Sequence, residues 1–222
     1  MKFRRLIISL LCMMVLTSMQ LQKPVKVVLF GDSITQAGVR PGGYISLMQQ
    51  SQTTYELIGA GIGGNKVYDL YLRMEDDVIK IKPDVVVIYV GVNDVWHKQT
   101  HQTGTDPDKF TSFYSAMIKK FQSAGIRVIV CTPAVIGERT DFSNPQDGDL
   151  NSYSQLIRNL AKQYNCSLVD LRKEFLGYNL ANNPGNKESG ILTTDRVHLN
   201  PAGNKLVADL MIKTLTGLKV EK

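Results

Sequence analysis

Three polar residues, far apart in the chain, have the types expected of a nucleophile, its base and an orienting acid. Ser33 comes shortly after an apolar run that ends at Phe30, whereas Asp195 and His198 lie three residues apart late in the sequence. A serine hydroxyl is a poor nucleophile until a base removes its proton, and an aspartate can fix the tautomer of a histidine base. If the three residues meet in space, they can attack a carbonyl carbon.

Attack on a carbonyl places negative charge on its oxygen, which must be met by hydrogen-bond donors. The sequence offers three candidates: the amide of Ser33, a glycine amide from residues 59–64, and the side-chain amide of Asn93. Each candidate lies just after an apolar run that we expect to form a strand. They should therefore gather at the carboxyl edge of one sheet, where open α/β proteins bind ligands.

These segments together resemble the SGNH, or GDSL-type, hydrolases, a family of esterases and lipases. Residues 31–33 read Gly-Asp-Ser, residues 91–94 read Gly-Val-Asn-Asp, and residues 195–198 read Asp-Arg-Val-His. A glycine-rich stretch, 59–64, lies between the first two in the order the family shows. The resemblance covers nearly all of residues 25–215, and four short patterns in order are far more specific than one.

The resemblance implies that Ser33 is the nucleophile, His198 the base and Asp195 the acid of a triad that needs no cofactor. It also implies an oxyanion hole made by Ser33, Gly64 and Asn93. Two features depart from the family pattern. The first block reads GDSI rather than GDSL, and the second begins with glycine where many members have asparagine. Gly61 and Gly63 therefore remain alternatives to Gly64.

Short apolar runs alternate with amphipathic stretches along the chain. Strands are predicted at residues 25–30, 55–60, 84–90, 126–131 and 167–171. Helices are predicted after Ser33 and at residues 42–50, 67–78, 107–121, 150–164 and 201–215, with polar loops at 97–106, 137–148 and 178–194. This alternation predicts an α/β fold, a three-layer α/β/α sandwich around a parallel, flavodoxin-like sheet of five strands.

Residues 1–22 have a basic start and then an apolar run, which is typical of a secretory signal peptide. An uncleaved anchor is the alternative, although the run is shorter than the roughly 20 residues that span a bilayer. Removing the three basic residues of this segment lowers the net charge from +6 to +3. We expect residues 23–222 to form a single exported domain, periplasmic or secreted, that binds neither nucleic acid nor, once the signal is removed, membrane.

Several other reactive residues are expected to have structural roles. Cys131 ends one predicted strand and Cys166 precedes the next, so they should lie at opposite ends of the sheet as free thiols. His97 and His101 lie four residues apart without an acidic partner, so we expect a loop pair rather than a metal site. Trp96 either lines the substrate pocket or packs beneath its loop.

Two aspartates beside the candidate site should also be structural. Asp32 is expected to cap the helix that follows it, and Asp94 to brace the Asn93 segment. The pattern G-x-S-x-G does not occur, so the nucleophile elbow of α/β-hydrolases is absent from the sequence.

The predicted function is carboxylic-ester hydrolysis through an acyl-enzyme, on small-molecule or carbohydrate esters with short acyl groups. The loops 97–106 and 137–148 are polar, and a long acyl chain needs an apolar groove, because each buried methylene contributes about 0.8 kcal/mol. A carbohydrate O-acetylesterase is the alternative within the class. A catalytically silent binding module is the alternative outside it.

Overall fold

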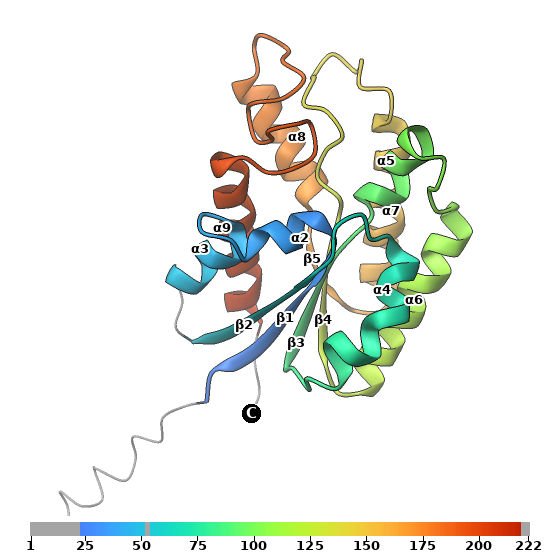
Figure 1. Ribbon diagram of the computed structural model, residues 1–222, viewed down its shortest axis with the longest axis vertical. Coiled ribbons are helices and arrows are strands. Elements are labelled where there is room, and N and C mark those ends of the chain that lie inside the picture. Colours follow the sequence, from blue (N-terminus) through green and yellow to red (C-terminus); the bar gives the residue numbers. More distant parts are fainter. Residues whose placement is uncertain (1–22, 52–53, 219–222) are drawn as a thin grey trace, which may run out of the picture.

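The computed structural model describes residues 23–51 and 54–218. The predicted signal peptide lies outside these residues. Within them, five parallel strands form one sheet in the order β2-β1-β3-β4-β5, which confirms the predicted flavodoxin-like fold (Figure 1). The strands are β1 (Val25–Gly31), β2 (Tyr55–Gly61), β3 (Val85–Tyr89), β4 (Arg127–Cys131) and β5 (Ser167–Val169).

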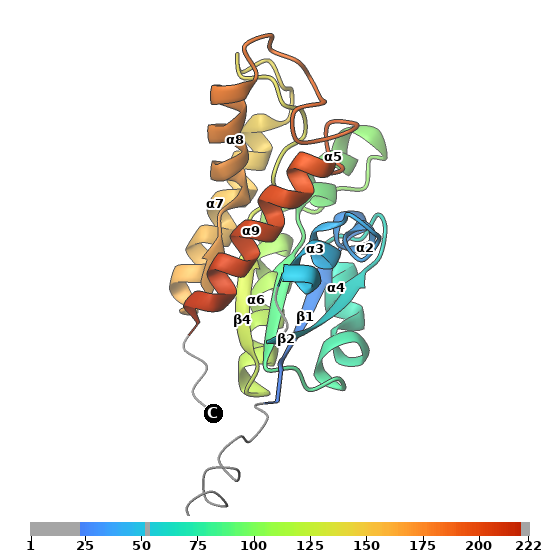
Figure 2. The same ribbon diagram turned by 90° about the vertical axis from the view of Figure 1, so that its left-hand side faces the viewer.

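Helices cover both faces of this sheet. Those described are α2 (Ser33–Gly38), α3 (Tyr44–Ser51), α4 (Val67–Met74), the π-helix η1 (Glu75–Ile79), α5 (Val92–Thr100), α6 (Pro107–Ser123), α7 (Asp147–Gln163), α8 (Leu171–Asn182) and α9 (Pro201–Gly217). Helix α6 packs against α4 and α7 on one face, while α3 packs against α9 on the other (Figures 1 and 2). The three predicted layers are therefore confirmed.

The central strands are buried because their sequences are almost entirely apolar. Every residue of β3 is buried, as are most residues of β1 and β4. Strand order reverses between β1 and β3, and the loops leaving these two strands diverge to opposite sides of the sheet. Such a switch point opens a crevice at the carboxyl edge. Ser33 and Asn93 lie immediately after these two strands.

All three predicted loops contain some helix, although in the loop 137–148 this is only the start of α7 at Asp147. Residues 97–100 belong to α5, which begins at Val92 and buries Val95 beneath it. Residues 178–182 belong to α8, although this stretch was predicted as loop from its asparagine and glycine content. Asp170 caps α8, and Phe175 and Asn179 are buried along it, so packing outweighs weak local propensity. The last strand correspondingly ends at Val169 rather than at residue 171.

The two cysteines within the described residues are free, as predicted. Cys131 pairs in register with Val169, whereas Cys166 precedes Ser167, the partner of Ile129. The thiols therefore lie at different levels of the sheet. Burial raises the pKa of the Cys166 thiol to about 11, which keeps it protonated and unreactive at neutral pH. Within residues 23–51 and 54–218, no helix combines the length and the apolar character that crossing a membrane requires.

Close backbone contacts hold the carboxyl edge of the sheet together. A Cβ atom at Gly31 would lie 2.3 Å from Oγ1 of Thr35 and 2.5 Å from the Tyr89 carbonyl oxygen. A Cβ atom at Gly61 would lie 2.1 Å from the amide nitrogen of Gln36. Only glycine fits at either position, so β1, β2, β3 and α2 meet at van der Waals distance beside Ser33.

Asp32 lies at the junction of β1 and α2 and is almost fully buried, with 1% of its surface exposed. Its Oδ1 accepts a hydrogen bond from the Ile34 amide at 3.0 Å, so it caps α2 as predicted. Burial raises the pKa of Asp32 from 3.8 to about 7; Asp94 adds to the rise, while the Ile34 amide and His198 oppose it.

This raised pKa links stability to pH. Between about pH 4 and 7 the folded chain keeps a proton on Asp32 that the unfolded chain has lost. The stabilising effect of that proton is complete below about pH 4 and disappears as the pH rises through 7. At alkaline pH, folding must bury an ionised carboxylate.

We therefore expect Asp32→Asn to stabilise the fold at pH 8 and to have little effect near pH 4. The amide oxygen can still accept from Ile34, and the titration is removed. The gain at pH 8 should not exceed about 4 kcal/mol, because each pKa unit corresponds to about 1.4 kcal/mol. Urea unfolding at pH 4, 6 and 8 measures it.

Asp209→Asn is the matched control, since Asp209 is exposed on α9. It tests whether losing one surface carboxylate changes the unfolding midpoint by itself. A stability difference for Asp32→Asn that is the same at all three pH values would contradict the buried-carboxyl interpretation.

Candidate active site

Ser33, His198 and Asp195 form a continuous chain of hydrogen bonds. Oγ of Ser33 lies 2.9 Å from Nε2 of His198, although 165 positions separate the two residues in sequence. Nδ1 of His198 lies 2.7 Å from Oδ2 of Asp195. Figure 1 shows the segment that leads into α9 lying above the carboxyl end of the sheet, next to α2. The structure therefore brings together the three residues that the sequence singled out.

Asp195 orients His198 through its own loop. Its Oδ1 accepts from the amides of Val197 and His198, at 3.1 and 2.8 Å, which leaves Oδ2 for the imidazole. Desolvation raises the pKa of Asp195, but the hydrogen bonds from His198 and Val197 outweigh it and the pKa is lowered. The ionised carboxylate holds the proton on Nδ1, so Nε2 is free to accept the proton of the Ser33 hydroxyl.

The glycine-rich loop presents an N–H group without an acceptor. The amides of Ser33 and Gly64 find no hydrogen-bond acceptor among the residues that the structure describes. The Gly63 amide donates to Oε1 of Gln36 at 3.0 Å, and Gly61 is the last residue of β2. Gly64 has a φ of +76°, a left-handed conformation that glycine adopts without strain.

Asn93 and Asp94 connect α5 to the same loop. One N–H of the Asn93 amide donates to the Asn65 carbonyl oxygen at 3.0 Å, which leaves its second N–H available. Both oxygens of Asp94 accept from the Val67 amide, at 3.2 and 3.3 Å. Asp94 thus braces the start of α4 rather than its own segment. Burial raises the pKa of Asp94 to about 6, and the nearby Thr105 hydroxyl and the hydrogen bond from the Val67 amide oppose this rise.

Two aromatic residues of α5 line the site. The ring of Trp96 lies 6.2 Å from that of His198 with an interplanar angle of 70°, an edge-to-face contact. Trp96 therefore packs against the imidazole ring of His198. The sequence left open whether Trp96 lines the substrate pocket or packs beneath its loop. His97 lies close to the loop, since its Cε1 would be 4.0 Å from a Cβ atom placed on Gly64.

His97 and His101 form a ring pair 4.3 Å apart, on α5 and its C-cap rather than in the predicted loop. Burial lowers the pKa of His97 to about 4, and electrostatic repulsion from Lys66 and His101 adds to this effect. The His97 imidazole is therefore uncharged at neutral pH. Among the described residues, no group of three or more His, Cys, Asp or Glu side chains is arranged to hold a metal ion.

Glu138 supports the site but was not identified from the sequence. Its side chain is buried, and its oxygens accept from the amides of Ile191, Leu192 and Thr193 at 2.8, 2.6 and 2.8 Å. The neighbouring Gly137 amide donates to the Arg196 carbonyl oxygen at 2.9 Å. The loop that carries Asp195 and His198 is therefore anchored on both sides. No pattern in residues 137–148 signals that one acid is buried.

Comparison with known proteins identifies the family of the chain. The sequence profile of the GDSL-like Lipase/Acylhydrolase family matches residues 29–206. Among solved structures, the chain is similar to an acetyl xylan esterase, AlAXEase, with 66% identity and a TM-score of 0.84. That similarity covers 85% of this chain and 98% of AlAXEase.

Two curated proteins are more distant relatives. An acetylxylan esterase from Geobacillus stearothermophilus is 27% identical over 212 residues, covering 86% of this chain and 93% of that protein. Catalytic mutants solved for Axe2, an acetylxylan esterase of the same organism, replace a serine, an aspartate and a histidine. An uncharacterized lipoprotein of Bacillus subtilis (strain 168), YqeF, is 24% identical over 207 residues, covering 82% of this chain and 85% of that protein.

The similarity to SGNH, or GDSL-type, hydrolases that the sequence predicted is thus confirmed by the family profile and by the solved esterase. The profile covers most of the chain, from the middle of β1 into α9. The chain therefore belongs to the GDSL-like lipase/acylhydrolase family, and it is a serine-type carboxylic-ester hydrolase.

Proposed function

We propose that this enzyme is a carbohydrate O-acetylesterase that uses a Ser33–His198–Asp195 triad. The observation that carries the proposal is the unbroken chain of hydrogen bonds from the Asp195 carboxylate through His198 to the Ser33 hydroxyl. The acetyl group and the sugar alcohol are inferred from the similarity to acetylxylan esterases, above all the one at 66% identity.

In the first half of the reaction, Oγ of Ser33 attacks the acetyl carbonyl carbon while Nε2 of His198 takes the hydroxyl proton. Asp195 stabilises the resulting imidazolium without taking its proton. The tetrahedral intermediate then collapses, and His198 gives its proton to the departing sugar oxygen. Ser33 is left as an acetyl ester.

In the second half, a water molecule attacks this ester. His198 takes a proton from the water as the new bond to carbon forms, and the second tetrahedral intermediate expels Oγ of Ser33. The proton returns to that oxygen from His198, so the products are acetate and the free enzyme. No cofactor enters either half of this scheme.

The proposed oxyanion hole consists of the amides of Ser33 and Gly64 and the side-chain amide of Asn93. Support for Gly64, rather than its neighbours, is that its N–H is unoccupied while Gly63 donates to Gln36. Support for Asn93 is that its contact with Asn65 fixes the amide while sparing one N–H. Donors held in place before the reaction need no reorganisation when charge develops.

The surroundings of the triad favour a small acyl group. Trp96 stands against the His198 ring, and His97 stands beside Gly64, so two aromatic side chains border the base and one proposed oxyanion donor. An acetyl group needs no further apolar surface beside these residues. A long acyl chain would need an apolar groove of its own to gain its burial energy.

Ser33→Ala and His198→Ala should each lower kcat by several orders of magnitude, and the double variant should be little worse than either, since a triad acts as a unit. Asn93→Ala should lower kcat by about 10²–10³, the cost of one oxyanion donor. Steady-state kinetics on 4-nitrophenyl acetate measures all four variants.

Ser152→Ala is the matched control, because Ser152 lies exposed on α7 and its hydroxyl bonds only to the Gly148 carbonyl oxygen. Its kinetics should equal those of the unmodified enzyme. Full activity of Ser33→Ala would end the proposed mechanism, and additive losses in the double variant would show that the two residues do not act together.

Substrate preference tests the two halves of the ester separately. In a series of 4-nitrophenyl esters from acetate to palmitate, kcat/KM should be highest at acetate and fall steeply beyond butyrate. Among acetyl esters, acetylated xylo-oligosaccharides should be hydrolysed with higher kcat/KM than triacetin, which carries the same acyl group on a small non-sugar alcohol.

Either of these two comparisons can also contradict the proposal. A maximum at long acyl chains would place the enzyme among lipases. Equal rates on triacetin and acetylated sugars would instead favour the second candidate, a general short-acyl esterase. This second candidate would use the same triad, and the polar character of residues 97–106 and 137–148 supports it.

Export completes the proposal, with residues 1–22 removed as a signal peptide and residues 23–222 left as one hydrolase domain. Support comes from the basic and apolar pattern of that segment and from the similarity to a lipoprotein. Mass spectrometry of protein recovered from the periplasm or the medium should find a chain that begins near residues 21–23. An intact Met1 in that fraction would contradict export with cleavage.

A further inference from the structure

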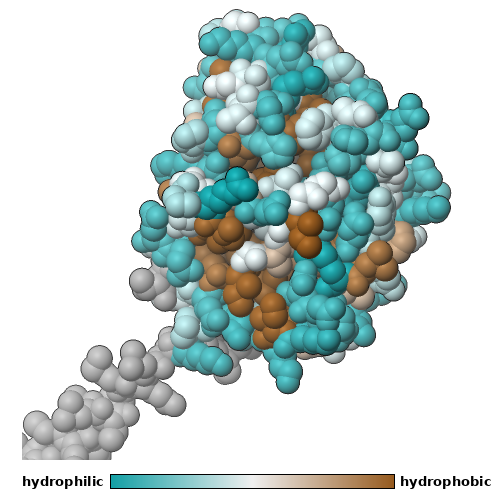
Figure 3. Space-filling view, in the orientation of Figure 1, coloured by the Kyte–Doolittle hydropathy of each residue, from teal (hydrophilic) through white to brown (hydrophobic). Residues whose placement is uncertain are grey.

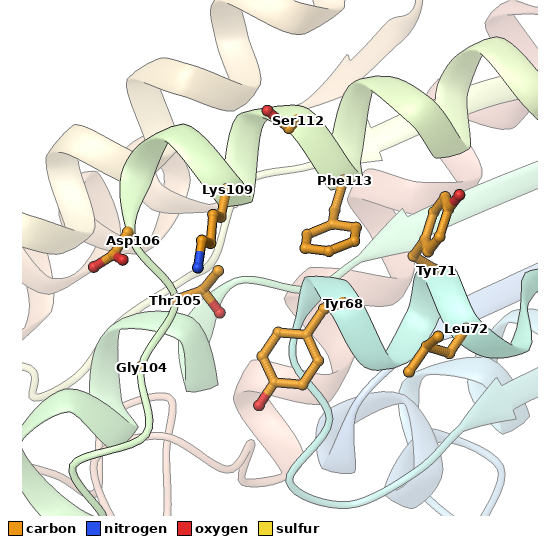
Figure 4. Close-up of a pocket in the computed structure, with 9 residues that line it drawn as sticks. All are labelled: Tyr68, Tyr71, Leu72, Gly104, Thr105, Asp106, Lys109, Ser112 and Phe113. Carbon is orange, nitrogen blue, oxygen red and sulfur yellow. The ribbon is translucent and has the colours of Figure 1, made fainter.

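We infer that a groove between α4 and α6 binds the polysaccharide chain that carries the acetyl group, an inference that rests on the function proposed above. The groove has a volume of about 610 Å³, within the range of small-molecule sites (Figure 4). Figure 3 shows apolar side chains at the surface where these helices meet, bordered by hydrophilic ones. We call it the α4/α6 groove.

Aromatic rings from both helices form its apolar wall. Tyr68 and Tyr71 lie one turn apart on α4 and flank Phe113 of α6, with ring centroids 6.5 and 5.2 Å from that of Phe113. All three rings are only partly buried. Tyrosine combines a flat apolar face with a polar tip, so it can pack against the C–H face of a sugar and still bond to its hydroxyls.

Polar side chains lie at regular spacing along the α6 side of the groove. Asp106, Lys109 and Ser112 lie three residues apart along the start and first turns of α6, and all three are exposed. One acid, one base and one hydroxyl give the wall no net charge. A neutral, hydroxyl-rich polymer fits this combination, whereas an acyl chain would leave the polar row unused and a polyanion would find one acid, Asp106, beside the one base, Lys109.

The groove and the candidate active site lie near each other at the start of α4. Nζ of the buried Lys66 lies 5.6 Å from the ring centroid of Tyr68, and Cε1 of His97 would lie 4.0 Å from a Cβ atom placed on Gly64, two residues before Lys66. The Thr105 amide, at the other side of the groove, donates to the Asp94 carbonyl oxygen at 3.1 Å. In the proposed complex, a chain with its acetyl group at Ser33 continues past Gly64 and His97 into the groove.

Two variants test this inference. Leu72 stands at the edge of the groove and is 78% exposed, so Leu72→Arg can obstruct it without disturbing the core. Tyr71→Ala removes one aromatic face. Each should lower kcat/KM roughly 3- to 10-fold on acetylated xylo-oligosaccharides of four to six residues, mainly through KM, as expected for one aromatic contact. Activity on 4-nitrophenyl acetate should change less than twofold.

Tyr178→Ala is the matched control, since Tyr178 is an exposed tyrosine on α8. It should affect neither substrate. In the unmodified enzyme, kcat/KM should rise with oligosaccharide length from two residues upward and then level off when the groove is filled. This length series needs no variant and so does not depend on how the variants fold.

The outcomes separate the groove from the proposed function. If acetylated xylobiose is hydrolysed but longer substrates and both variants behave alike, the groove inference is wrong and the proposed function stands. If no acetylated sugar is hydrolysed while 4-nitrophenyl acetate is, the proposed function itself fails. If Leu72→Arg changes the mass in solution by light scattering and leaves the length series unchanged, the groove is a contact between copies of the chain, which also overturns the inference.

Discussion

Three consecutive backbone amides, those of residues 191–193, point at the Glu138 carboxylate, and the base of the proposed triad depends on them. The segment between α8 and α9 has no sheet ladder to fix it, only the isolated bridge between Thr193 and Leu199. Hydrogen bonds to an ionised group contribute about 1.5–3 kcal/mol each, and a buried carboxylate without them would be strongly disfavoured. The Glu138 carboxylate therefore stabilises the loop, and the loop supplies the donors that the buried carboxylate requires. Together they help to hold His198 in position beside Ser33.

The serine side is fixed by sterics rather than by charge. Gly31 and Gly61 leave no room for a Cβ atom, so α2 begins directly against the ends of β1 and β2. Asp32 then turns the chain by capping α2, at the cost of a buried carboxyl whose pKa is raised to about 7. The two halves of the site are thus held by different means, backbone contact on one side and a buried carboxylate on the other. They meet in the single hydrogen bond from Ser33 to His198.

The sequence predicted those features that local patterns encode. Apolar runs ending in glycine located the strands and the residues after them, so the sequence alone placed Ser33 and Asn93 at the sheet edge. The spacing of Asp195 and His198 reflects a local turn, which is also readable. Glu138 and the α4/α6 groove depend on pairing between distant segments, which no local pattern encodes. Helix α8 was partly missed because its residues 178–182 belong to a stretch, 178–194, whose asparagine and glycine content favours loops.

A single short turn carries both the acid and the base of the proposed triad, so the two contacts of the triad depend on different parts of the structure. Asp195 bonds to the backbone and to the ring of His198 within four residues, so the contact between acid and base is set inside that turn. The contact between Nε2 of His198 and Oγ of Ser33 joins residues 165 positions apart, so it depends on how the turn is anchored to the rest of the fold. Loss of the anchor would therefore separate the nucleophile from its base while the base keeps its acid.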